Sequence, residues 1–270
     1  MPRLFNPFQH AHGDDVHRLL SDWFKTDLGA EVLQKETTLL GRLLPSMFGY
    51  YLVQAGVGQP QWLAENSVIH RKLYVCEQPQ RSSRYHCVCS RLDEMAIATE
   101  SVDVAILHHS LDFESAPHRV LREVSRVVIP GGKIVIVGFN PWSLWGLCRL
   151  VLAASDRLPW SGNFLSPYRL SDWLKLLDFQ VEGCESVMHG LPTASKRTRK
   201  LFGWLSFLGQ HVWRQQGGIY VLVATKQVST LTPIKPKRLS VRDSLVQIPI
   251  AGIAKPSTRK WWTPKGDPKT

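Results

Sequence analysis

Residues able to bind or activate a ligand follow three segments that have the apolar character of buried strands. They are Gly56 and Gly58 after residues 50–55, His108 and His109 after residues 102–107, and Asn140 after residues 133–139. Glycine lets a ligand approach the backbone, imidazole exchanges a proton near neutral pH, and a carboxamide both donates and accepts hydrogen bonds. Open α/β sheets bind ligands at the carboxyl ends of their strands. The sequence therefore predicts a ligand site at that edge.

The segment GFNPWSLWG, residues 138–146, carries the aromatic part of this predicted site. Asn140 is a candidate for orienting a polar group of a substrate, and Trp142 and Trp145 are candidates for its aromatic walls. The two tryptophans can equally belong to the core. Aromatic walls would favour an apolar or planar substrate.

Apolar periodicity predicts the elements that hold these residues in place. Strands are expected at residues 50–55, 72–76, 86–90, 102–107, 133–139, 180–187 and 219–225, and helices from residue 14 and at 28–44, 62–65, 117–127 and 170–177. Alternating strands and helices indicate a parallel sheet that is covered on both faces. Residues 78–86 are too few for a crossover helix, so a loop is expected there.

Residues 101–146 resemble the second half of the nucleotide-binding sheet of class I S-adenosylmethionine (SAM) dependent methyltransferases. The GFNPWSLWG segment is similar to that of a small bacterial group of these proteins. The resemblance covers residues 14–236, and it implies SAM as cofactor and a Rossmann-like α/β fold. That fold has a mostly parallel seven-stranded sheet with a reversed edge strand.

Three parts of the chain are expected on this basis. They are an N-terminal helical cap at residues 1–45, a methyltransferase-like domain at 46–227 and a basic, proline-rich tail at 228–270. The tail is expected to be loosely ordered, because proline prevents continuous helix.

The first part of the expected cofactor site is a degenerate glycine motif. Members of the methyltransferase family carry a motif of the form Asp-x-Gly-x-Gly-x-Gly. The corresponding residues 54–60 of this chain read QAGVGQP, with Gln54 in place of the acid and Pro60 in place of the third glycine. The resemblance implies that Gln54, Gly56 and Gly58 line the cofactor; a strand-to-helix turn with positive φ is the alternative. Glu77 matches the acid that accepts hydrogen bonds from both ribose hydroxyls, or else is an exposed acid at a strand end.

The second part is the region that reads the adenine. Members of the methyltransferase family carry a motif of the form Asp-x-x-x-Leu-Pro-Phe in this region. The corresponding residues 91–97 of this chain read RLDEMAI, so Arg91 replaces the acid. The resemblance implies adenine contacts from the Leu92 backbone, Asp93 and the apolar Met95, and places His108 and His109 where the cofactor meets the substrate. Each lost charged hydrogen bond costs about 1.5–3 kcal/mol, so weak SAM binding is expected.

The expected reaction is methyl transfer to an unidentified small molecule. The acceptor needs a base only if it is a weakly acidic O–H or N–H group, and His109 is then the candidate, with Asn140 orienting the acceptor. A His109 that only caps the strand end is the alternative. A catalytically inactive binding or scaffold protein that uses basic surfaces is the second interpretation. A nicotinamide-dependent oxidoreductase is disfavoured because GxGxxG is absent.

Charge and composition bear on partners and location. The tail contributes +7 of the net charge of +11. The basic segments 196–200 and 235–269 are therefore candidate contacts for an acidic membrane surface or nucleic acid, or are simply solvated. No secretory signal is visible and residues 142–154 are too short to span a bilayer, which predicts a cytoplasmic protein.

No metal site is predicted from the sequence. His10, His12 and His17 have no acidic or cysteine partner at a matching spacing. The five cysteines also lack zinc spacing, so free buried thiols are expected.

Overall fold

The structure is a computed structural model that describes residues 13–56, 63–76, 86–152, 159–190, 192 and 217–228. The chain divides into two compact units, Met1–Ser229 and Thr230–Thr270. All described residues lie in the first unit. The expected loop at 78–86, apart from His86 itself, the segment 196–200 and the tail from residue 229 onward lie outside the described residues.

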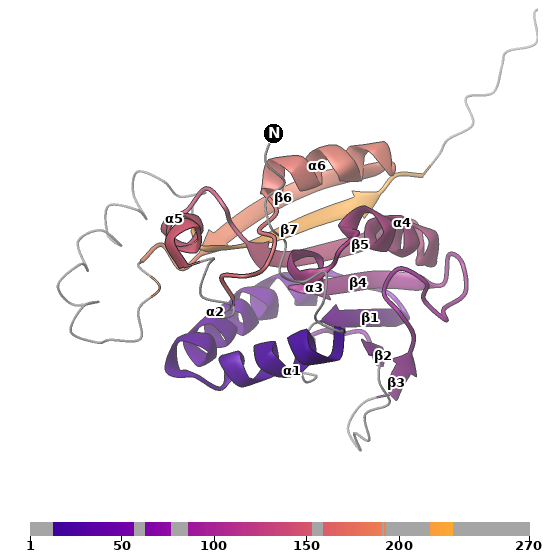
Figure 1. Ribbon diagram of the computed structural model, residues 1–270. Helices are drawn as coiled ribbons and strands as arrows, with labels where there is room; N and C mark the ends of the chain where they lie inside the picture. The colour runs from indigo at the N-terminus through magenta and orange to yellow at the C-terminus, as the bar shows by residue number, and fades with distance from the viewer. Residues whose placement is uncertain are drawn as a thin grey trace, which may run out of the picture. The chain divides into compact units, whose positions relative to one another are not determined.

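The described strands form one seven-stranded sheet in the order β3-β2-β1-β4-β5-β7-β6 (Figure 1). They are β1 (Tyr51–Gly56), β2 (Arg71–Cys76), β3 (His86–Cys89), β4 (Val102–His108), β5 (Val128–Phe139), β6 (Phe179–Val187) and β7 (Ile219–Lys226). Strands β1 to β5 pair in parallel, and β7 runs antiparallel to both β5 and β6. The predicted α/β fold is confirmed, with the reversed strand one position inside the edge that β6 forms.

The strand order reverses between β1 and β4, because β1 leads outward to β2 and β3 on one side while β4 leads to β5 on the other. Gly56 at the end of β1 is paired in register with His108 at the end of β4. In open α/β sheets this reversal leaves a crevice at the carboxyl ends of the two strands. The fold therefore brings two of the predicted site residues side by side.

The described helices are mostly those that the periodicity predicts. They are α1 (Gly13–Phe24), α2 (Asp27–Leu43), α3 (Ser110–Phe113), α4 (Pro117–Val127), α5 (Leu144–Leu152) and α6 (Pro167–Leu176). Thr26 caps α2 by accepting a hydrogen bond from the Gly29 backbone N–H at 3.2 Å, and Ser166 caps α6 in the same way. None of these helices has the length and apolar character that a membrane crossing requires.

Some expected elements differ from the structure. The predicted helix at 62–65 is wrong for its described residues, since Leu63 and Ala64 are irregular and Glu65 begins a turn. Helices α3 and α5 were not predicted. None of the five cysteines, all of which are described, forms a disulfide, as expected. Only Cys76 is buried, however, whereas Cys87 and Cys148 are half-buried and Cys89 and Cys184 are exposed.

Two apolar cores cover the two faces of the sheet. Alternate residues of a strand point to opposite faces, so Val104 and Ile106 pack with α1 and α2 while Ala105 and Leu107 pack with α4 and α6. Figure 1 shows α1 and α2 together on one side of the sheet and α4 and α6 on the other. The N-terminal helices are therefore an integral layer that adjoins the carboxyl end of β4.

The chain leaves β5 through a tightly packed turn into α5. The Asn140 side chain donates to the Gly217 carbonyl at 3.1 Å and accepts from the Trp142 backbone N–H at 3.0 Å. Gly146 packs so closely on Pro141 that a Cβ at this position would overlap the Pro141 carbonyl. The glycine in GFNPWSLWG is thus required by a close backbone contact.

We expect Gly146→Ala to lower the free energy of unfolding by about 1–3 kcal/mol, because the added methyl group overpacks this turn. Urea denaturation followed by circular dichroism measures the change. Gly183→Ala is the matched control, since no atom lies within 4 Å of the position that its added methyl group would take. An equal unfolding midpoint for Gly146→Ala and the wild type would contradict this close packing of Gly146 on Pro141.

Candidate functional site

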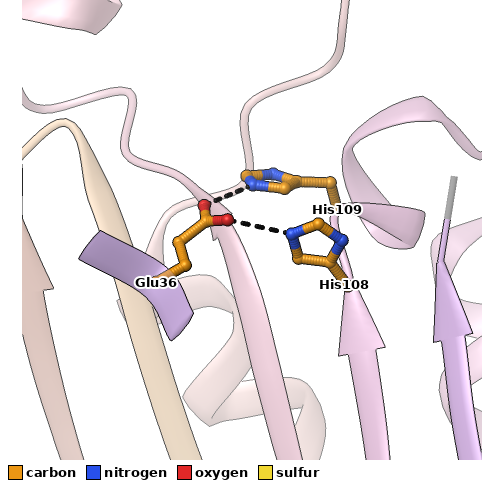
Figure 2. Close-up of side chains that lie close together, drawn as sticks. All are labelled: Glu36, His108 and His109. Atoms are coloured by element: carbon orange, nitrogen blue, oxygen red, sulfur yellow. Dashed lines mark hydrogen bonds and ion pairs between the residues drawn. The ribbon is translucent and has the colours of Figure 1, made fainter. Parts of the chain in front are cut away.

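One buried carboxylate joins two histidines at the end of β4. Glu36 of α2 accepts hydrogen bonds from His108 Nε2 at 2.9 Å and from His109 Nε2 at 2.8 Å, one on each carboxylate oxygen (Figure 2). The side chains of Glu36 and His109 are 0% exposed, and that of His108 is 4% exposed. An ionised carboxylate can only accept hydrogen bonds, so both Nε2 atoms carry hydrogens.

The second ring nitrogen of His109 is also engaged. His109 Nδ1 lies 3.0 Å from Asp112 Oδ2, and the same oxygen accepts from the Phe139 backbone N–H at 3.0 Å. Asp112 belongs to α3 and Phe139 ends β5. The carboxylate of Asp112 therefore fixes the ring of His109 against the neighbouring strand.

Aromatic rings enclose the two imidazoles. The ring of His109 stacks on Phe139 with centroids 4.2 Å apart, and the ring of His108 stacks on Phe24 at 5.4 Å. Both phenylalanines are buried. The hydrogen bonds of the cluster consequently act in an environment of low polarity, where they are stronger than in water.

The charges of the cluster shift the pKa of each member. Burial alone would raise the pKa of Glu36, but the charges of His109 and His108 outweigh it and lower this pKa to about 2. Burial opposes the charged form of His109, but the charge of Glu36 and the hydrogen bond to Asp112 raise its pKa to about 9. Burial lowers the pKa of His108 and raises that of Asp112. At neutral pH the cluster holds ionised Glu36, protonated His109 and neutral His108.

His109 also has an unusual backbone. Its φ of 50° lies in the left-handed region, and it stands immediately before α3. This region is uncommon for residues other than glycine, and such conformations cost about 1–3 kcal/mol and gather at functional sites. The turn aims the imidazole toward Glu36 and Asp112 instead of continuing the strand.

The described part of the glycine motif is packed against its neighbours. Gln54 is buried, and its Oε1 accepts a hydrogen bond from the Leu63 backbone N–H at 3.1 Å. A Cβ on Gly56 would lie 3.3 Å from the His108 carbonyl oxygen and 3.5 Å from the Tyr74 hydroxyl. Gly56 does not have positive φ, so close approach of neighbouring groups accounts for it. Gly58 lies outside the described residues.

The predicted adenine-reading residues follow β3. Leu92 and Met95 are buried. The carboxylate of Asp93 is held by Arg91 through Nε at 2.9 Å and through Nη2 at 3.0 Å. Glu77, the predicted ribose acid, lies outside the described residues. The structure thus gives Asp93 a partner within the chain and packs Leu92 and Met95 into the core on one face of the sheet.

The aromatic segment after β5 divides between core and surface. Trp145 is fully buried, stacks on Phe139 and donates a hydrogen bond to the Gly190 carbonyl at 3.2 Å. Trp142 is 68% exposed. The side chain of Asn140 is occupied by the backbone contacts of its turn. Of the two predicted aromatic walls, Trp145 is therefore part of the core.

Sequence reasoning missed three residues of this site: Glu36, Asp112 and Tyr74. One signal was available for Glu36, which interrupts the apolar stripe of α2 formed by Val32, Leu39 and Leu40. An acid at a core-facing helix position must find a partner, because an unpaired buried charge is costly. The partner itself, more than 70 residues away, leaves no mark in the sequence.

Comparisons with known proteins agree with this fold. Residues 66–136 match a family model described as a methyltransferase domain. A SAM-dependent methyltransferase from Thermotoga maritima is similar over 72% of this chain and 89% of its own, with a TM-score of 0.54 and 17% identity. A chain from a Haloferax volcanii complex with the Trm112 methyltransferase activator is similar over 79% of this chain and 98% of its own, with a TM-score of 0.57 and 15% identity. These likenesses show the class I methyltransferase fold.

A relative shows the family. The uncharacterized protein YafS of Escherichia coli K12 is 32% identical over 194 residues, which are 71% of this chain and 75% of YafS. The chain belongs to the same family as YafS, and its residues 66–136 carry the match to a methyltransferase domain.

We expect Glu36→Ala to destabilise the protein by about 3–5 kcal/mol, because it leaves two buried imidazoles without their acceptor. Thermal and urea unfolding measure the loss. Lys35→Ala on the same helix is the matched control, since the half-exposed Lys35 forms an ion pair with Glu31 at 3.3 Å, and such surface pairs contribute about 0–1 kcal/mol. Similar losses in the two variants would show that the buried cluster adds nothing special to stability.

Proposed function

We propose that the protein is a SAM-dependent methyltransferase of low activity whose acceptor is a small apolar or aromatic molecule. The observation that carries this proposal is the reversal of strand order between β1 and β4, with Gly56 and His108 paired at its carboxyl edge. The match of residues 66–136 to a methyltransferase domain supports the same function. The alternative is a binding or scaffold protein that has this fold without catalysis.

The proposed cofactor would be held at the carboxyl ends of β1 and β2. Gly56 ends β1 without a side chain, and Glu77 follows β2 directly in the sequence. The side chains of Leu92 and Met95 are buried, so this segment would meet the adenine mainly through its backbone. Gln54 already accepts a hydrogen bond from the Leu63 N–H, and Asp93 is bound by Arg91. These two side chains are thus already engaged within the chain, which favours weak binding of the cofactor.

Methyl transfer is an in-line displacement in which the acceptor forms a bond to the methyl carbon as the carbon–sulfur bond breaks. The electrons of that bond pass to the sulfur, and S-adenosylhomocysteine leaves. The protein mainly supplies alignment and exclusion of water. Phe24 and Phe139, which are buried against the two histidines, keep the surroundings of the β4 end apolar, and this favours an apolar acceptor.

An acceptor that must lose a proton needs a base, and His109 is the proposed one. In the arrangement described, His109 is protonated and both of its nitrogens are engaged. It could accept a proton only after its bond to Glu36 opens and its own proton leaves. This requirement favours acceptors that need no base. Asn140, the other proposed catalytic residue, would act mainly by holding its turn in place.

The proposed setting and partners rest on sequence alone. The protein is proposed to be cytoplasmic, and the basic segments 196–200 and 235–269 are proposed contacts for acidic lipid or nucleic acid. Both segments lie outside the described residues.

Calorimetric titration with SAM and S-adenosylhomocysteine tests the function. We expect binding by the wild type, and at least tenfold weaker binding by Glu77→Ala, because the ribose loses a charged acceptor of two hydrogen bonds. Glu65→Ala, an exposed acid in the turn before β2, is the matched control and should bind like the wild type. Equal affinity in Glu77→Ala would refute the ribose role. No heat from the wild type at millimolar ligand would favour the scaffold alternative.

A further inference from the structure

We propose that Glu36, His108 and His109 form a binding site for a divalent transition-metal ion. One carboxylate oxygen of Glu36 and one ring nitrogen of each histidine lie within 4.8 Å of one another. Two imidazoles and one carboxylate are a ligand set of catalytic zinc sites and of non-haem iron sites. Figure 2 shows that α2 supplies the carboxylate and the end of β4 both imidazoles, all pointing to one place.

The present distances are close to those of a metal site. The nitrogens lie 2.8 and 2.9 Å from the Glu36 oxygens, in direct hydrogen bonds. Tetrahedral zinc with bonds of about 2.0–2.1 Å requires ligand atoms about 3.3 Å apart. An outward movement of about 0.5 Å by the Glu36 carboxylate, which a rotation within its flexible side chain can supply, would bring these two nitrogen–oxygen distances to that value.

The surroundings of His109 match those of a metal ligand. Its Nδ1 is held by Asp112 Oδ2 at 3.0 Å, and that oxygen is itself fixed by the Phe139 N–H. Metal-ligating histidines almost always donate their second N–H to such a carboxylate or carbonyl, which sets the tautomer and orients the ring. Asp112 thereby leaves the lone pair of Nε2 directed at the site once the proton there has left.

A dication also suits the charge of the cluster. Glu36 is 0% exposed and Asp112 is 1% exposed, so both carboxylates are buried. Buried carboxylates require paired positive charge or a metal. Arg149 lies within electrostatic reach of Asp112, but its Nε donates to the Trp160 carbonyl at 3.3 Å. With both imidazoles neutral, one divalent ion balances Glu36 and Asp112.

The position of the site suggests a role beyond stability. Three protein ligands leave at least one coordination position for water or a substrate, as in catalytic rather than structural zinc sites. The site lies at the carboxyl end of β4, where His108 pairs in register with Gly56 at the strand-order reversal. The sequence predicted no metal here because Glu36 stands 72 positions before His108, a separation that no local spacing pattern reveals.

The test is a titration of the full-length, chelator-treated protein with Co²⁺, without SAM, so that its result does not depend on methyltransferase activity. We expect visible absorption of low-symmetry Co²⁺ that saturates at one ion per chain and is abolished by Zn²⁺. Glu36→Gln and His108→Gln should weaken Co²⁺ binding at least 100-fold. Asp112→Asn should weaken it by about 10–100-fold. His118→Gln, an exposed histidine on α4, is the matched control and should bind like the wild type.

Two results would overturn the proposal. One is a wild type that shows neither Co²⁺ absorption nor a Zn²⁺-dependent rise in melting temperature, which would leave the cluster a proton-linked network without metal. The other is saturable binding that folded Glu36→Gln and His108→Gln retain, which would place the ion on other residues. Circular dichroism establishes whether each variant is folded. If neither variant folds, the two wild-type measurements decide.

Discussion

The carboxylate of Glu36 is the contact on which the architecture of this site depends. It joins the N-terminal helices to the end of β4 through two hydrogen bonds formed without solvent. Removing ions from water is costly, and only mutual attraction and well-formed hydrogen bonds offset the loss. The helix pair α1–α2 is therefore held on the sheet by these two hydrogen bonds as well as by its apolar contacts. The position of this layer and the ionisation of the two histidines are consequently linked.

The sheet explains why the cluster lies where it does. Parallel strands end at a common edge, and the change of direction between β1 and β4 opens that edge between Gly56 and His108. The chain then turns sharply at His109 into α3, which returns Asp112 to the ring of the same histidine. A short helix and one left-handed residue thus convert the end of an ordinary strand into a group of four interacting polar side chains.

Local patterns in the sequence predicted most of the elements but little of the site. Helix α4 begins at Pro117 and ends at Val127 as expected, because its apolar spacing and its proline are local signals. Helix α5 was missed because its residues are apolar on nearly every side. His109 was selected as a candidate, yet its partner Glu36 is 73 positions away. Such a pairing arises from the packing of α2 on the sheet, which no local pattern encodes.

The left-handed backbone of His109 carries a consequence for how this family can diversify. Glycine, asparagine and aspartate tolerate that conformation best, whereas β-branched residues are strongly disfavoured. None of the tolerated side chains can contact Glu36 and Asp112 from opposite sides of one ring, as imidazole does. Drift at this position would therefore demand a simultaneous change in a distant helix, and evolutionary paths through single substitutions are few. A lineage that abandoned the histidine should show glycine or asparagine here, together with an apolar residue in place of Glu36.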